Sequence, residues 1–382
     1  MKKRVLSGII CLLFISLLLT ACRGDAVLSS SETVSAIAKQ ESVSEIEKTD
    51  KNGFTFVFDP YVLSARCRKS LGGTAAYHRF IDAVLAHEST FTLPSGQDYD
   101  RLRFAVGENF PLSFLIRDSF YNAQTGQVKL AFRYNEKESA ERILDFSEKI
   151  GDVLRSCVQK KDDPALASLV LYDWILNNIS IETAASLSTK QSVSSVSGST
   201  SAGSSTAQNH VSSSGASSAV SSGNSDNNGS LEAADLYYAL SKGAATSGSA
   251  AALYSFLLRQ LGIDCETVGC WAGGAYRGLN LICLSGKWYY CDLTGAFLSG
   301  SGLSHFGLTQ EALRKNLAQE FFLQNADGVS FGTGTYLWYT ESLPRAVSKR
   351  FENLHTATSW EIGSDRKSLE VRTQDSRFLW EF

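Results

Sequence analysis

The sequence predicts an α+β fold, because helical patterns come first and an antiparallel set of strands follows them. Apolar residues recur at helical spacing in two runs within residues 141–180, and again from Ser247 to Leu261. Three later segments alternate or run apolar as strands do: "CETVGCWA", "GLNLICL" and "KWYYCDL". Ser285-Gly286 joins the last two as a two-residue hairpin turn. Helices followed by such a meander are typical of an α+β domain.

Local signals support the individual elements. Asp162-Asp163-Pro164 marks the start of the second helical run, since Asp favours the position before a helix and Pro its first turn. A further helix, "LEAADLYYAL", precedes the one at Ser247. Near the C-terminus, "GTGTYLWYTE" and "KSLEVRTQDSRFLWEF" alternate as strands do, so we expect a β-rich region over 311–382.

The N-terminus has the build of an export signal. Lys2, Lys3 and Arg4 precede an apolar run that is shorter than the roughly 20 residues of a comfortable membrane span. Leu19-Thr20-Ala21-Cys22 follows, and it resembles the lipobox of bacterial lipoproteins, in which the cysteine is acylated and becomes the mature N-terminus. An ordinary cleaved signal beside Cys22 is the alternative. We expect a signal peptide over 1–22 and a lipid anchor at Cys22, on the extracytoplasmic face of the cell membrane.

Two segments of low complexity interrupt the periodic patterns. Residues 23–52 have almost no aromatic side chains and no sustained apolar period, so they predict a flexible tether. Residues 183–228 are rich in Ser and Gly and cannot bury enough apolar surface to offset the entropy of ordering, so they predict disorder. This Ser-rich tract either separates two domains or interrupts one.

Charge and cysteine content limit the classes of function. The net charge of −3 over 382 residues, with Lys and Arg dispersed, excludes a basic nucleic-acid-binding face. After Cys22, an even number of cysteines remains, which outside the cytosol permits disulfides. Four of them sit at strand-like positions, where buried thiols fit equally well. The state of these residues stays open: Cys67, Cys157, Cys265, Cys270, Cys283 and Cys291.

Four segments carry a family pattern in one order: "YDWILNNIS", "ALYSFLLRQLGIDCETV", "LNLICLSGKWYYCDLT" and "HFGLTQEAL". They resemble the transglutaminase-like superfamily, whose fold is that of the papain-like cysteine proteinases. Upstream, "FVFDPYVLS" and "YHRFIDAVLAHESTFTLP" resemble the N-terminal region of bacterial lipoproteins that carry this domain. The resemblance implies a small α+β region over 53–140 and a transglutaminase-like domain over 141–310. Because matched helices lie on both sides of the Ser-rich tract, we expect the tract to be an insertion in one domain.

The resemblance also implies where a catalytic triad would lie. The family uses a Cys at a helix N-terminus as nucleophile, a His on the hairpin to move the proton, and an Asp to orient the His. Counting back from Leu261-Gly262-Ile263 puts Ser247 at the position of the Cys. Counting back from Asn280-Leu281 puts Arg277 at the position of the His. Only the Asp is kept, as Asp292.

No shift of the alignment restores the missing groups. There is no cysteine between Cys157 and Cys265, and no histidine between His305 and His210, which falls inside the Ser-rich tract. Around the nucleophile position, the family's glycine and aromatic residue are replaced by Ser249 and Ala250.

Ser247 lacks a general base at the expected position. The guanidinium of Arg277 is a permanent cation with no acceptor nitrogen, so it cannot take a proton from a serine. In a serine protease, loss of the nucleophile or of the base lowers turnover about a millionfold. We therefore interpret Ser247 as a helix N-cap, and Arg277 with Asp292 as an ion pair in the place of the His and Asp, with ligand capture as the alternative.

Three further candidates carry less weight. His305 is interpreted as a surface or packing residue, because no cysteine lies at a catalytic spacing from it. His78 and His87 are nine residues apart on an expected helix, too far for a metal pair on one face. Trp288-Tyr289-Tyr290 is expected to face the core on one side and to form a cleft wall on the other.

The sequence thus predicts a membrane-anchored lipoprotein that binds without catalysis. The expected partner is a peptide, a cell-wall component or another protein, with no nucleic acid, cofactor or metal. The rival prediction is an active hydrolase or acyl transferase, a peptidase or amidase, that uses Ser247 as its nucleophile.

Overall fold

The computed structural model describes the chain from Phe56 onward with several gaps. The described residues are 56–94, 98–182, 235–272, 275–317, 321–323, 329–331, 334–336 and 343–382, and all belong to the unit Ser42–Phe382. The predicted signal peptide over 1–22, its Cys22, the tether over 23–52 and the Ser-rich tract over 183–228 lie outside them. Within the described ranges, no helix has the length and apolar character needed to cross a membrane.

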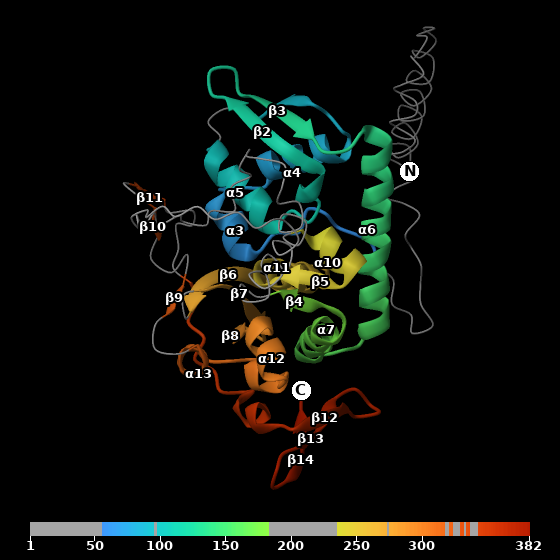
Figure 1. The fold of residues 1–382 in the computed structure, drawn as a ribbon, viewed down its shortest axis with the longest axis vertical. Coiled ribbons are helices and arrows are strands. Elements are labelled where there is room, and N and C mark those ends of the chain that lie inside the picture. The colour runs from blue at the N-terminus through green and yellow to red at the C-terminus, as the bar shows by residue number, and fades with distance from the viewer. Residues whose placement is uncertain are drawn as a thin grey trace, which may run out of the picture. The chain divides into compact units, whose positions relative to one another are not determined.

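Helices and a small sheet form the first part of the described chain (Figure 1). Ser64 and Asp98 cap two of the helices, since each side chain accepts a hydrogen bond from the backbone N–H three residues later. The strands pair antiparallel in the order β1-β3-β2, and Phe91, Val128 and Leu130 bury one face of this sheet. In chain order the elements are α3 (Ala65–Ser70), α4 (Ala75–Leu85), β1 (Thr90–Thr92), α5 (Tyr99–Asn109), β2 (Ile116–Asn122) and β3 (Gln127–Phe132).

Two long helices follow, α6 (Glu136–Cys157) and α7 (Pro164–Asn178). At the start of α6, Asn135 and Glu138 form a capping box, in which each side chain bonds the other residue's backbone N–H. Asp163 is the N-cap of α7 and Pro164 is its first residue, as the sequence predicts. The two helices expected within 141–180 are confirmed.

The chain after the Ser-rich tract returns to the chain before it. It forms α10 (Leu236–Lys242), β5 (Ala244–Thr246) and α11 (Ser247–Gln260). Strand β5 pairs in parallel with β4 (Ser180–Glu182), which lies just before residues 183–234. Helix α11 confirms the helix expected from Ser247 to Leu261.

Helix α11 packs against an antiparallel sheet that consists of β6 (Cys265–Ala272), β7 (Ala275–Leu284), β8 (Lys287–Cys291) and β9 (Phe321–Leu323). The order of the strands in this sheet is β8-β7-β6-β9 (Figure 1). Ser285 and Gly286 have φ of 50° and 72°, the positive values of a type I′ hairpin turn. The predicted meander is confirmed.

Both faces of this sheet are covered by apolar side chains. Tyr289 belongs to the larger core, whereas Tyr290 belongs to a second apolar cluster with Val268 and Leu313, against which Trp288 also packs. Tyr289 and Tyr290 are each 1% exposed. The expected cleft wall on one side of this strand is therefore wrong, because α13 (Gln310–Asn316) and the chain around it bury that face.

The C-terminal part consists of short helices and strands. Arg366 bonds Asp162 through both nitrogens of one guanidinium edge, at 2.6 and 2.7 Å, which joins the last sheet to the loop between α6 and α7. The elements are α12 (Leu293–Ser299), β10 (Val329–Phe331), β11 (Gly334–Tyr336), β12 (Ser359–Ile362), β13 (Ser368–Arg372) and β14 (Arg377–Glu381). The strands expected in "GTGTYLWYTE" and "KSLEVRTQDSRFLWEF" are confirmed in part of each segment by β11, β13 and β14.

One apolar core runs from Phe56 to Val371 and takes side chains from helices and strands alike. The fold is α+β, as the sequence predicts. Because the core crosses residues 140 and 310, side chains from all three predicted regions pack together.

Candidate functional site

The site expected from the sequence begins at the N-terminus of α11. Thr246 is the N-cap of this helix: its backbone is extended, with φ −71° and ψ 165°, and its Oγ1 accepts a hydrogen bond from the Ser249 N–H at 3.2 Å. Ser247 is the first helical residue and is 8% exposed. The expected N-cap role of Ser247 is therefore wrong, because the preceding threonine supplies the capping oxygen.

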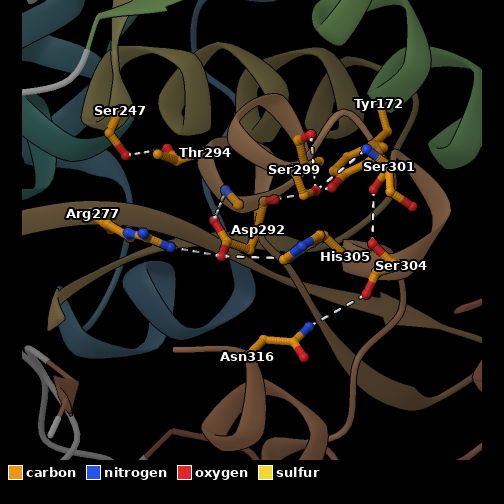
Figure 2. Close-up of polar contacts among 12 residues, drawn as sticks. Tyr172, Ser247, Arg277, Asp292, Thr294, Ser299, Ser301, Ser304, His305 and Asn316 are labelled. Carbon is orange, nitrogen blue, oxygen red and sulfur yellow. Dashed lines mark hydrogen bonds and ion pairs between the residues drawn. The ribbon is translucent and has the colours of Figure 1, made fainter. Parts of the chain in front are cut away.

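The Ser247 hydroxyl makes two hydrogen bonds of its own. The Gly278 N–H on β7 donates to Ser247 Oγ at 2.9 Å. Thr294 Oγ1, at the start of α12, lies 2.5 Å from the same oxygen, and Figure 2 shows this second contact. Gly278 allows this approach, since a Cβ there would lie 2.7 Å from the Ser247 carbonyl oxygen. Both partners of Ser247 lie close in sequence to the other two predicted site residues: Gly278 directly follows Arg277, and Thr294 lies two residues after Asp292.

Arg277 and Asp292 contact each other directly, which confirms the predicted ion pair. Arg277 Nη1 lies 3.4 Å from Asp292 Oδ2, and the two side chains are 23% and 0% exposed. The other carboxylate oxygen, Oδ1, accepts a hydrogen bond from the Gly295 N–H at 2.8 Å, so Asp292 also caps α12. Tyr172 of α7 donates its hydroxyl to the Asp292 carbonyl at 3.1 Å. These contacts hold the carboxylate in a fixed orientation.

His305 is the second group that reaches Asp292. Its Nδ1 lies 3.7 Å from Asp292 Oδ2, and its side chain is 12% exposed (Figure 2). Nδ1 is buried, and no hydrogen-bond partner for it exists among the described residues. Burial lowers the pKa of His305, and the charge of Asp292 opposes that shift. His305 is a packed side chain, as expected, but it lies beside the aspartate of the predicted site.

No pattern in the sequence predicts that His305 lies beside Asp292. The chain returns antiparallel to the end of β8: Tyr290 exchanges two backbone hydrogen bonds with Leu308, and the Asp292 N–H donates to the His305 carbonyl at 3.0 Å. Gly295 keeps the space between the two side chains open, since a Cβ there would lie 2.4 Å from Asp292 Oδ2 and 2.6 Å from His305 Nδ1. The contact between Thr294 and Ser247 could not be predicted from the sequence either, because the two residues meet only in the folded chain.

All six cysteines of the described chain are unpaired thiols, which decides between the two states that the sequence left open. Cys270 lies opposite Arg277 on the neighbouring strand, yet it is 0% exposed, and burial raises its pKa to about 12. Burial also raises the pKa of Cys67 and Cys265 to about 12. Such thiols carry almost no thiolate at neutral pH, so these three cysteines are poorly suited to act as nucleophiles.

The structure separates the two histidines near the N-terminus. His78 lies on α4 and packs edge-on against Tyr61, with ring centroids 5.0 Å apart. His87 lies beyond the end of α4, in a left-handed conformation with φ 52°, and stacks on Phe132 at 3.9 Å. Placing both on one helix was therefore wrong, because the helix ends at Leu85. No cluster of three metal-ligating side chains occurs in the part of the chain that the structure describes.

The arrangement can hold charge but leaves Ser247 without a base. Arg277 and His305 both face Asp292, while Ser247 Oγ bonds a backbone N–H and a threonine hydroxyl. Neither of those partners accepts a proton at neutral pH. As it stands, the geometry favours a fixed polar cluster over a serine nucleophile.

Comparison with known proteins adds no family. A scan against models of known protein families finds no match, and a search of curated proteins finds no similar chain.

Proposed function

We propose that this protein is an extracytoplasmic lipoprotein whose transglutaminase-like domain binds a partner without catalysing a reaction. The lipobox-like Leu19-Thr20-Ala21-Cys22 supports the lipid anchor. The four family segments quoted above support the transglutaminase-like assignment, and the order of α11 and strands β6 to β8 agrees with it.

The positions of the three vestigial residues support the same assignment. Ser247 begins the helix that packs on β6 and β7, Arg277 lies on β7, and Asp292 follows β8. In the family, a nucleophile, a base and an orienting acid occupy these places. Here the arginine has taken the position of the base and neutralises the acid at 3.4 Å.

The main support for a non-catalytic function comes from the hydrogen-bond partners of the Ser247 hydroxyl. It is 2.9 Å from the Gly278 amide nitrogen and 2.5 Å from Thr294 Oγ1, and no side chain among its described partners can act as a base. A serine hydroxyl needs such a base to become a nucleophile at neutral pH. The role that remains for the domain is to bind a peptide, a cell-wall component or another protein at the cell envelope.

One observation favours the rival function, a serine-dependent peptidase or amidase. His305 and Asp292 form an imidazole–carboxylate pair at 3.7 Å, and burial lowers the pKa of His305, which favours the neutral imidazole. His305 makes no hydrogen bond to Ser247 in this structure. The rival function would need Ser247 to leave Thr294 and turn toward His305 when substrate binds.

Turnover by the purified protein separates the two functions. We expect neither amidase nor transamidase turnover above background, no labelling by serine-directed activity probes, and the same result for Ser247→Ala and His305→Ala. Turnover by the native protein that disappears in both variants would defeat the binding proposal and establish the serine enzyme. Ser304→Ala is the matched control, because that serine bonds the Ser301 carbonyl and makes no contact with Asp292.

The lipid anchor has a separate test. Cys22→Ser removes the sulfur that acylation requires, so we expect the variant to leave the membrane fraction or to stay unprocessed. Metabolic labelling with a fatty acid measures this directly. Equal labelling of the native and Cys22→Ser proteins would contradict the anchor.

A further inference from the structure

A cavity of about 710 Å³ lies at the end of α11 opposite to Ser247. Its walls come from residues 59–78 on one side and from residues 259–264 on the other. Since α11 has 14 residues, its two ends are about 20 Å apart. The cavity is therefore distinct from the site of Ser247, Arg277 and Asp292.

Two carboxylates line this cavity, and one oxygen of each accepts a hydrogen bond from a backbone N–H. Asp59 Oδ1 accepts a hydrogen bond from the Tyr61 N–H at 2.8 Å, and Asp264 Oδ1 accepts one from the Ala65 N–H at 3.0 Å. Within the described chain, neither carboxylate has an arginine or lysine within 4.0 Å, and neither Oδ2 has a hydrogen-bond partner. The backbone bonds fix the two side chains while leaving an acceptor oxygen on each.

Two guanidinium groups line the same cavity. Arg259 is 6% exposed, its Nη1 donates to the Cys265 carbonyl at 3.1 Å, and its Nε is buried without a described acceptor. The buried acid nearest in sequence, Glu266, pairs with Arg66 instead. Arg68 is exposed and donates to the Leu63 carbonyl at 3.4 Å. Neither Arg68 nor Arg259 has a carboxylate within 4.0 Å among the described residues.

Opposite charges that share a cavity without pairing define the kind of ligand that suits it. A simple anion would be attracted by the arginines and repelled by the aspartates. A simple cation would be attracted by the aspartates and repelled by the arginines. A ligand with one ammonium and one carboxylate group satisfies both pairs at once. Charge-assisted hydrogen bonds to such groups are the strong ones in proteins, and Arg offers two parallel donors to a carboxylate.

We infer that this cavity binds a short peptide with a free ammonium and a free carboxylate terminus. The cavity volume falls in the range of roughly 300–1,000 Å³ that is usual for small-ligand sites. The cavity therefore has room for a ligand larger than a single amino acid. Val62, Leu63 and Ile263 add apolar wall for the side chains between the two ends. The inference rests on the cavity and its charges and is independent of the transglutaminase-like assignment.

Tri-alanine with both ends free is the probe, titrated into the full-length protein in detergent and followed by calorimetry. We expect saturable binding at one site. Acetylating its N-terminus or amidating its C-terminus should each weaken binding about tenfold or more, because each removes a charged partner.

Variants connect each end of the probe to its partner. Arg68→Gln should weaken binding of free tri-alanine about tenfold yet leave the already weak binding of the amidated peptide unchanged. Asp264→Asn should weaken binding of free tri-alanine about tenfold and leave the already weak binding of the acetylated peptide unchanged. The Oδ1 of the new asparagine can still accept the hydrogen bond from the Ala65 N–H. Arg372→Gln and Asp375→Asn are the controls, because both residues are exposed and lie outside the cavity lining. Thermal melting verifies that all four variants are folded.

Three results would overturn the inference. They are no binding of tri-alanine, binding that does not change when either end is blocked, and equal losses in the cavity variants and the controls. None of these results bears on turnover at Ser247, so the inference and the proposed function fail separately.

Discussion

At the scale of single residues, the site is defined by which groups share Asp292. Its Oδ2 faces Arg277 at 3.4 Å and His305 at 3.7 Å, and its Oδ1 caps α12. A buried carboxylate needs such partners, since an unpaired charge in the protein interior is costly. Arg277 provides that charge permanently, whereas an imidazole at that position would do so only when protonated.

Introducing a cysteine at position 247 and a histidine at position 277 tests the proposed transglutaminase-like assignment of these positions. In Ser247→Cys with Arg277→His, a thiol at the N-terminus of α11 would meet an imidazole near Asp292, which lowers a thiol pKa. We expect faster alkylation by iodoacetamide below the usual thiol pKa of about 8.5, with a second titration from the imidazole. Ser249, Ala250 and the close Thr294 can still misplace the sulfur at a cost of about a hundredfold in any recovered turnover.

The single variant Ser247→Cys is the control for this experiment. It has the same helix terminus but keeps Arg277, so its thiol should titrate once. The native protein gives the background from its buried cysteines, whose pKa values are raised. Identical pH profiles of the single and double variants would mean that position 277 does not reach position 247, and the assignment would be wrong.

At the scale of elements, two glycines set how closely helices approach the strands of the site. Gly278 lets β7 lie against the first turn of α11, and Gly295 lets the first turn of α12 lie against Asp292 and His305. A Cβ added at Gly278 would meet backbone atoms first, with the Ser247 carbonyl oxygen at 2.7 Å and Gly248 Cα at 2.9 Å. Backbone atoms cannot turn away as a flexible side chain can, so this contact has little room to adjust.

A methyl group at Gly278 should therefore force α11 and β7 apart. We expect Gly278→Ala to lower the free energy of unfolding by about 1–3 kcal/mol, the usual cost of overpacking a core, as measured by urea denaturation. Gly107→Ala is the matched control: this glycine lies within α5, no atom lies within 4 Å of the added Cβ, and alanine favours a helix by about 1 kcal/mol. Equal stability of Gly278→Ala and the native protein would show that the contact is looser than described.

At the scale of the whole molecule, segments distant in sequence close a single core. Strands β4 and β5 pair across residues 183–234, and α7 packs against both α11 and α12. The Tyr254 hydroxyl donates to the Ser168 carbonyl at 2.8 Å, which joins the buried interiors of α11 and α7. The chain on both sides of the Ser-rich tract therefore contributes to one folded unit.

Shortening the Ser-rich tract tests whether it is an insertion. Replacing residues 183–228 with a short Gly/Ser loop changes loop-closure cost by only about 0.6 kcal/mol for each halving of length. We expect one cooperative melting transition at nearly the native temperature, followed by circular dichroism. In the native protein, cutting within the tract by a protease should leave the two fragments associated. Fragments that separate without denaturant would contradict the insertion and favour two domains.

Many of the helices and strands could be predicted from the sequence, because their signals are local. Asp163-Pro164 starts α7, Ser285-Gly286 turns the hairpin, and apolar spacing predicts α11. The ion pair of Arg277 with Asp292 was also within reach, since it joins neighbouring strands of one meander. Where two cap residues were adjacent, at Thr246 and Ser247, local signals could not tell which one caps the helix.

Which distant side chains meet could not be predicted from the sequence, because it depends on how the elements pack in the folded chain. His305 reaches Asp292 because the chain after α12 pairs with the end of β8, a contact that no spacing in the sequence encodes. The partners of Ser247 and the burial of both faces of β8 depend in the same way on packing between elements. So does the cavity between residues 59–78 and 259–264, whose charges are some 200 positions apart in the chain. Such contacts depend on how all the elements together bury their apolar side chains in one core. Local sequence patterns contain no information about that packing.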